Sequence, residues 1–289
     1  MKGKVDYHPL TVARLPLTFS TLGCPDWPWR RVLDEAVRLG YAGIELRGLD
    51  GEMELTRRAE FSAARIADTR RELASRELVI SDLGASTRLH EPDPRTREAQ
   101  LDDARRYIDL AHRLGAPWVR VFPDRAVTGE PREATIARIG AGLAELARFA
   151  RGSGVGVLVE SHGDFTDGAS LAAIMKAARE APGAGLLWDT HHTVMTGRER
   201  PEDTWPLIGR NVHHTHLKDS KRQGDGVRYV LTGKGDVDVR HVVGVLKRAG
   251  YTGFYGLEWE KRWHPDLPGP EVAFPQFVEV MREYLAVPA

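Results

Sequence analysis

Four short apolar runs in the second half of the chain each end in a side chain that can bind a metal ion. The runs VGVLVE, AGLLWD, NVHHTH and FYGLE end at Glu160, Asp189, His216 and Glu258. The first two intervals each match the ~30 residues of one strand–helix unit in a β/α barrel, and the third fits a unit with a longer loop. Parallel strands of such a barrel end on one face, so the four side chains would converge on one site. Two Glu, one Asp and one His suit a divalent cation.

The remainder of the chain shows the same alternation of strands and helices. Eight apolar runs predict strands near residues 17, 44, 80, 119, 158, 187, 214 and 256. Between them, helical spacing is found in WRRVLDEAVRLG, which ends at Gly40, in Arg58–Arg76, after Asp93-Pro94, and in Glu133–Arg151. Continuous apolar strands indicate a parallel sheet covered on both faces. The 289 residues therefore predict one α/β domain, a (β/α)8 TIM barrel over residues 1–289, with residues 1–14 as an N-terminal arm. An open doubly wound sheet is the weaker alternative, since no GxGxxG follows the first strand.

Composition limits the partners. The 41 basic and 41 acidic residues give a formal charge of +0, which argues against a nucleic-acid binder. No apolar stretch reaches the ~18 residues of a membrane span, and the N-terminus lacks the apolar core of a signal peptide. The single cysteine, Cys24, suits a reducing compartment. We expect a soluble cytoplasmic protein that binds neither nucleic acid nor membrane, and a homo-oligomer is left open.

The four ligand-bearing segments resemble a known metal site. Glu in VLVESHG, Asp in LLWDTHH, His in HHTHLKD and Glu in YGLEWE resemble the metal ligands of the xylose-isomerase-like sugar isomerase/epimerase superfamily. YAGIELRG and LTGKGDVDVRHVVGVLKRAGYTGFYGLEWE are also similar to family segments, so the resemblance covers nearly the whole chain. It implies that Glu160, Asp189, His216 and Glu258 bind one divalent ion. Carboxylate and imidazole ligands without cysteine favour Mn²⁺ or Co²⁺, with Mg²⁺ or Zn²⁺ as alternatives.

The same resemblance implies a reaction. Glu160 and Glu258 would flank a small carbohydrate, a sugar, sugar phosphate or keto-polyol, and transfer a proton through a metal-stabilised enediolate, as a metal-dependent isomerase or epimerase does. A dehydratase or lyase of the inosose dehydratase or 3-keto-glycoside type is the alternative. An endonuclease IV-like nuclease is less favoured, because the early strands lack its extra His ligands. A non-catalytic sugar-binding barrel is also less favoured, because both glutamates are retained.

Five further residues are candidates for substrate binding: Glu45, Arg47, His162, His192 and Lys218. Glu45 and Arg47 are two residues apart and point the same way, either into the substrate mouth or into an internal salt bridge. Lys218 would contact an anionic substrate group or pair with Asp219.

The histidines near the expected ligands carry similar alternatives. His162 would contact substrate or orient Glu160. The resemblance implies that His192 binds a substrate oxygen, while His191 is the alternative or a solvent-facing loop residue. His214 is favoured as a packed neighbour of the site.

Other polar residues near the strand ends are interpreted structurally. Arg120 is expected to be a paired structural charge. Glu260 is the alternative to Glu258 as the ligand at this strand end, and the family pattern favours Glu258. Trp263 and His264 are candidates to cover the site, and Asp236 or Asp238 to cap a helix.

Overall fold

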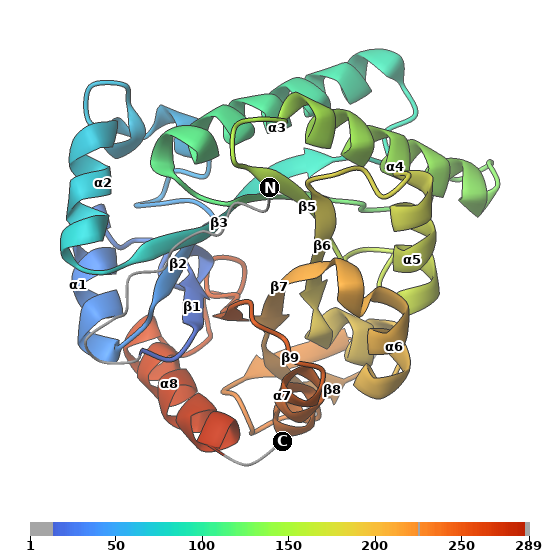
Figure 1. Cartoon of the computed structure of the whole chain (residues 1–289). Coiled ribbons are helices and arrows are strands. Elements are labelled where there is room, and N and C mark those ends of the chain that lie inside the picture. The colour runs from blue at the N-terminus through green and yellow to red at the C-terminus, as the bar shows by residue number, and fades with distance from the viewer. Residues whose placement is uncertain (1–13, 225, 287–289) are drawn as a thin grey trace.

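Eight parallel strands close into a barrel in the computed structural model, which describes residues 14–224 and 226–286 (Figure 1). Each barrel strand pairs with the one before it in the chain, and the last pairs with β1. The strands are β1 (Leu17–Ser20), β2 (Gly43–Leu46), β3 (Val79–Arg88), β4 (Trp118–Phe122), β5 (Gly156–Glu160), β6 (Ala184–Asp189), β7 (Val212–Leu217) and β10 (Tyr255–Leu257). The single (β/α)8 barrel and its eight strand positions are confirmed. Residues 1–13 of the expected arm lie outside the described residues.

In the described part of the chain, eight α-helices lie around the outside of the barrel (Figure 1). They are α1 (Trp29–Leu39), α2 (Ile66–Ser75), α3 (Pro94–Leu114), α4 (Arg132–Phe149), α5 (Gly168–Ala177), α6 (Pro201–Ile208), α7 (Val239–Arg248) and α8 (Pro270–Ala286). Their ends follow local chemistry: Asp93 accepts from Thr96 N at the start of α3, and Gly40 ends α1 with a left-handed φ of 83°. Asp238 caps α7 through His241 N, so of the two predicted caps Asp238 is the one used.

The predicted helix over Arg58–Arg76 is wrong in its first half. That segment holds a short 3₁₀ turn, Ala59–Phe61, and α2 begins only at Ile66. Phe61 is buried edge-on against Trp29, with ring centroids 5.6 Å apart, and the next residue, Ser62, is extended at ψ 159°. Burying this ring takes the chain out of the helical path, because the aromatic contact outweighs local helix propensity.

Strand register determines which side chains meet at the carboxyl end of the barrel. Asp189 pairs with His216, and His216 pairs with Gly256. Glu258 lies two residues beyond Gly256, so its side chain points to the same side one step further along the strand direction. All residues of β5, and those of β6 from Gly185 onward, are buried, which brings Glu160 and Asp189 into a water-poor layer at the end of the core.

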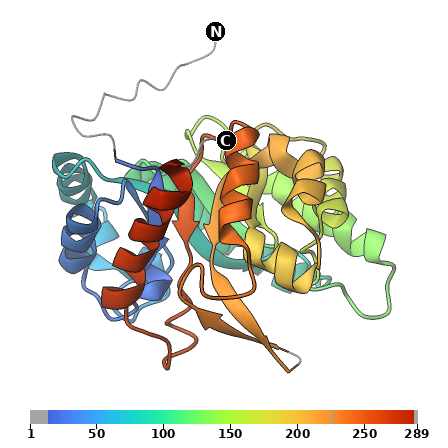
Figure 2. The same cartoon turned by 90° about the horizontal axis from the view of Figure 1, so that it is seen from below.

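A two-stranded antiparallel sheet interrupts the barrel pattern between β7 and α7. It consists of β8 (Asp219–Gln223) and β9 (Gly226–Val230), and it extends beyond the barrel on the same face as the loop before α8 (Figure 2). This hairpin was not predicted from the sequence. Part of its signal was present, since GDG at residues 224–226 is typical of a tight hairpin turn and the following run, VRYV, alternates apolar and polar residues at its start.

Candidate metal centre

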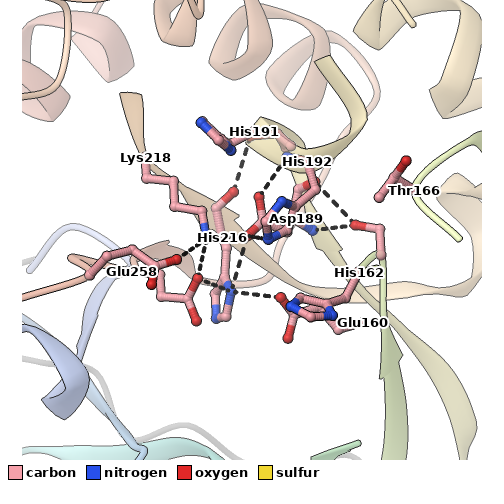
Figure 3. A network of polar contacts seen from close by, with 12 residues as sticks. Glu160, His162, Thr166, Asp189, His191, His192, His216, Lys218 and Glu258 are labelled. Atoms are coloured by element: carbon pink, nitrogen blue, oxygen red, sulfur yellow. Dashed lines mark hydrogen bonds and ion pairs between the residues drawn. The ribbon is translucent and has the colours of Figure 1, made fainter. Parts of the chain in front are cut away.

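Glu160, Asp189, His216 and Glu258 meet at the carboxyl end of the barrel strands. Their ligand atoms all lie within 4.8 Å of one another (Figure 3). His216 Nδ1 is 3.8 Å from Glu160 Oε1, 3.7 Å from Asp189 Oδ2 and 3.5 Å from Glu258 Oε2. All four residues are buried. The structure thus brings together the four side chains that the sequence singled out.

The atoms at the middle of this group suit a cation. His216 Nδ1 is buried and makes no hydrogen bond, and Asp189 Oδ2 is buried beside Lys218 Nζ at 2.8 Å. The other Asp189 oxygen, Oδ1, accepts the backbone N–H of His192 at 3.1 Å, which leaves Oδ2 directed at the group. Buried polar atoms without partners are costly, so three carboxylates and one imidazole nitrogen around one point fit a divalent metal ion.

The electrostatics of the group agree with its geometry. Burial alone would raise the pKa of Glu258, but the charges of Lys218 and His216 hold it well below its usual range. Burial would lower the pKa of His216, whereas Glu45 and Glu258 raise it well above the ordinary value. Metal binding would require the imidazole to be neutral, because a histidine ligand binds through an unprotonated nitrogen.

Glu45 positions His216 from beneath. Its Oε2 lies 2.6 Å from His216 Nε2, across 171 residues of sequence, and the side chain is buried. This contact holds the proton on Nε2 and leaves Nδ1 free to act as the ligand. Glu45 is absent from the residues that line the adjacent pocket. The structure therefore places it as an internal partner of His216 and His214, rather than at the substrate mouth.

Lys218 is buried in the centre and fully engaged. Its Nζ lies 2.8 Å from Asp189 Oδ2 and 2.8 Å from Glu260 Oε1, and it also donates to Glu258. Asp219 instead accepts backbone N–H groups of Ser220, Gly235 and Val237, so the alternative in which Lys218 pairs with Asp219 is wrong. Lys218 holds two carboxylates of the site side by side.

A pocket of about 250 Å³ opens beside the four ligands. Among the expected substrate contacts it is lined by Arg47, His162 and His192. The His162 ring is tilted against Phe122 and lies edge-on to His192, with ring centroids 4.6 and 5.2 Å apart. Burial lowers the pKa of His162, so the ring is neutral at physiological pH. A neutral imidazole beside the Phe122 ring suits hydroxyl groups.

His191 departs from its expected surface position. It is buried, and its Nε2 lies 2.8 Å from Ser220 Oγ, at the base of the hairpin. Burial and the charge of Lys218 lower its pKa to about 3. The interpretation of His191 as a solvent-facing residue is wrong, because the π-helical turn His192–Thr196 and β8 enclose it.

The importance of Arg120 for the pocket wall was underestimated from the sequence, and Tyr229 was missed. Arg120 is paired as predicted, with Nε 3.1 Å from Glu160 Oε2, yet it also lines the pocket. Tyr229 comes from the unpredicted hairpin, and its ring lies 5.1 Å from that of His264. The predicted cover residues Trp263 and His264 both line the pocket. Only the signal for a hairpin at residues 219–230 could have found Tyr229.

The barrel and its group of ligands at the carboxyl end define a β/α-barrel protein with a candidate metal centre. The sequence matches the family described as "Xylose isomerase-like TIM barrel" over residues 33–284, and the chain belongs to this family. No curated protein matches the sequence.

Solved structures share the fold at low identity. The IOLI protein with a bound zinc atom is 18% identical, with a TM-score of 0.77 over 94% of this chain and 99% of that one. The probable 3-DHS dehydratase AsbF from Bacillus anthracis is 16% identical, with a TM-score of 0.72 over 92% and 98%. The 3-keto-D-glucoside 4-epimerase YcjR from E. coli is 11% identical, with a TM-score of 0.67 over 89% and 93%. Within the described residues no helix is long and apolar enough to cross a membrane.

The positioning of His216 by Glu45 can be tested by mutation. Glu45→Gln should weaken binding of Mn²⁺ at least about tenfold, because outer hydrogen-bond partners of a ligand His typically contribute 10–100-fold. Calorimetric titration of metal-stripped protein measures the change. Asp82→Asn is the matched control, since Asp82 contacts His214 and not His216 in this cluster. Equal metal affinity of Glu45→Gln and the wild type would contradict the positioning role.

Proposed function

We propose that this chain is a divalent-metal-dependent isomerase or epimerase of a small keto sugar or keto-polyol. The observation that carries this proposal is the pair Glu160 and Glu258. Their carboxylates lie on either side of His216 Nδ1, at 3.8 and 3.5 Å, and both border the pocket. They come from β5 and from the end of β10, which are separated in the barrel by β6 and β7.

The two carboxylates suit proton transfer at carbon. The pKa of each lies below its usual range, because burial is outweighed by Arg120 at Glu160 and by Lys218 at Glu258. Each is thus ionised and able to accept a proton from the carbon next to a substrate carbonyl. A divalent ion held by Glu160, Asp189, His216 and Glu258 would polarise that carbonyl and offset the developing negative charge. Mn²⁺ or Co²⁺ is the ion that we propose.

The other pocket residues would orient the substrate. His162 and His192 would hydrogen-bond its hydroxyl groups, and Trp263 and His264 would limit the access of water from above. If one glutamate returned the proton to the other face, the product would be an epimer. If a β-hydroxyl left instead, the protein would be a dehydratase. The fold likeness to a probable dehydratase keeps that second reaction as the alternative.

Solvent exchange tests the reaction class. Metal-loaded protein in D₂O is given ketoses, ketose phosphates, keto-aldonates and keto-inositols, and the products are analysed by NMR and mass spectrometry. We expect deuterium at the carbon next to the carbonyl of at least one compound, even where net conversion is slow, because abstraction and return to the same face leave only the label. Metal-stripped protein is the control. Conversion of panel members without any deuterium, together with cleavage of abasic-site DNA, would favour a nuclease.

A further inference from the structure

Arg47 is a buried cation without an acidic partner. Arg47 comes directly after β2, and the residue is 8% exposed. Its Nη2 donates to Ser86 Oγ at 3.0 Å, whereas Nη1 is buried and has no hydrogen-bond partner. Within residues 14–224 and 226–286, no carboxylate oxygen lies within 4.0 Å of its guanidinium, although many other arginines form such pairs. Arginine is rarely buried unless it is paired, because an isolated charge is costly to remove from water.

Arg120 lies beside Arg47 against the same glycine. A Cβ on Gly84 of β3 would come within 2.6 Å of Arg47 Cδ and 2.7 Å of Arg120 Nη2. Arg120 is fully buried, with Nη1 donating to Ala85 O at 3.0 Å and Nη2 without a partner. Burial and the charge of Arg120 lower the pKa of Arg47 to about 10, so both guanidinium groups are charged at neutral pH. Two like charges held together in a buried position favour an anion between them.

Arg47 differs from the other charged side chains that line the pocket, because each of those has an oppositely charged partner. Glu160 pairs with Arg120, while Glu258 and Glu260 are bound by Lys218. Both arginines line the same pocket as Glu160, Glu258, His162 and His192. The planar fork of arginine matches carboxylate and phosphate oxygens with two parallel hydrogen bonds.

We propose that Arg47 and Arg120 form a subsite for an anionic group of the substrate, a carboxylate or a phosphate, so that the substrate is an acidic keto sugar. This inference rests on the proposed function of the pocket, since it assigns the kind of keto sugar that the pocket selects. Arg47 donates through its free Nη1 and Arg120 through its free Nη2. Lys218 takes no part, because three carboxylates already engage it.

Binding of three matched unreactive probes tests the subsite. D-glucitol is neutral, D-gluconate carries a carboxylate, and D-glucitol 6-phosphate carries a phosphate. Calorimetry on Mn²⁺-loaded protein, and on chelator-treated protein, should show at least one anion binding about 10- to 100-fold more tightly than glucitol, as one or two hydrogen bonds to a charged group provide. Preference for gluconate identifies a sugar acid, and preference for the phosphate identifies a sugar phosphate. Equal binding of all three, or no binding at millimolar concentration, overturns the proposal.

Variants of Arg47 test whether this residue causes the preference for the anionic probe. Arg47→Gln should lose about 10- to 100-fold in affinity for the preferred anion and keep its affinity for glucitol, and Arg47→Lys should recover part of the loss. Arg262→Gln removes a nearby charge that does not line this pocket, and it should retain the preference. An equal loss for all three probes in Arg47→Gln would contradict the subsite. If the protein exchanges deuterium into a substrate but shows no preference for the anionic probes, the anion subsite is wrong and the proposed function stands. If anions bind in an Arg47-dependent manner but no compound shows exchange, the proposed function is wrong.

Discussion

Replacement of Glu160 or Glu258 with Gln should lower turnover at least on the order of 100-fold. Gln keeps an oxygen that can face a metal ion but removes the group that accepts a proton, and a positioned general base typically contributes 10²–10⁴-fold. Both side chains lie at the carboxyl end of the barrel, beyond the packed layers of the core. The fold should therefore survive, which circular dichroism can verify.

Steady-state rates on whichever panel compound shows exchange provide the measurement. Glu260→Gln is the matched control, because Glu260 contacts Lys218 next to Glu258 but lies outside the group of four ligands. Its loss should be much smaller, since an amide oxygen can keep the contact with Lys218. Wild-type turnover in both Glu160→Gln and Glu258→Gln would show that neither carboxylate transfers the proton. A larger loss in Glu260→Gln than in Glu258→Gln would reassign the role to the later glutamate.

His216→Ala should abolish most metal binding. His216 Nδ1 is the only nitrogen in the four-residue group and lies within 3.8 Å of all three carboxylates. Loss of a direct ligand should exceed the ~10–100-fold that follows loss of an outer partner. Protein purified without chelator should contain near-stoichiometric metal, and the variant should contain little, as measured by elemental analysis.

His213→Ala is the matched control for this variant. His213 lies on the same strand but on the other side, where its ring stacks on Trp118 at 4.5 Å. Its removal should leave the metal content unchanged. If His216→Ala kept the metal content of the wild type, the ion would be bound elsewhere and the candidate centre would lose its basis.

The fold could be predicted because its signals are local. Continuous apolar runs mark strands that are covered on both faces, and Gly40 or Asp93 marks helix ends within a few residues. The break at Phe61 could not be predicted, because it depends on a ring contact with Trp29, which is distant in sequence. The hairpin had a local signal that was overlooked.

The site was predictable to the same extent. Placing a ligand at each strand end needs only the strand positions and the rule that parallel strands end on one face. The contact between Glu45 and His216 depends on register around the whole barrel, and the sequence left Glu45 with two readings. The adjacency of Arg47 and Arg120 depends on the absence of a side chain at Gly84, which lies on the strand between them. Contacts across the barrel therefore decide roles that residue type and spacing leave open.

The β8–β9 hairpin lines the pocket but is not part of the barrel that positions the candidate ligands. Each barrel strand is paired on both edges, so a change in its length would shift the register that aligns Asp189 with His216. The hairpin is a separate two-stranded sheet, and it contributes Tyr229 to the pocket wall. A change in its length would leave intact the pairing of the barrel strands that position the four candidate ligands. Under the proposed function, exchange of this hairpin between homologues would therefore alter substrate choice while the four candidate ligands stay in register.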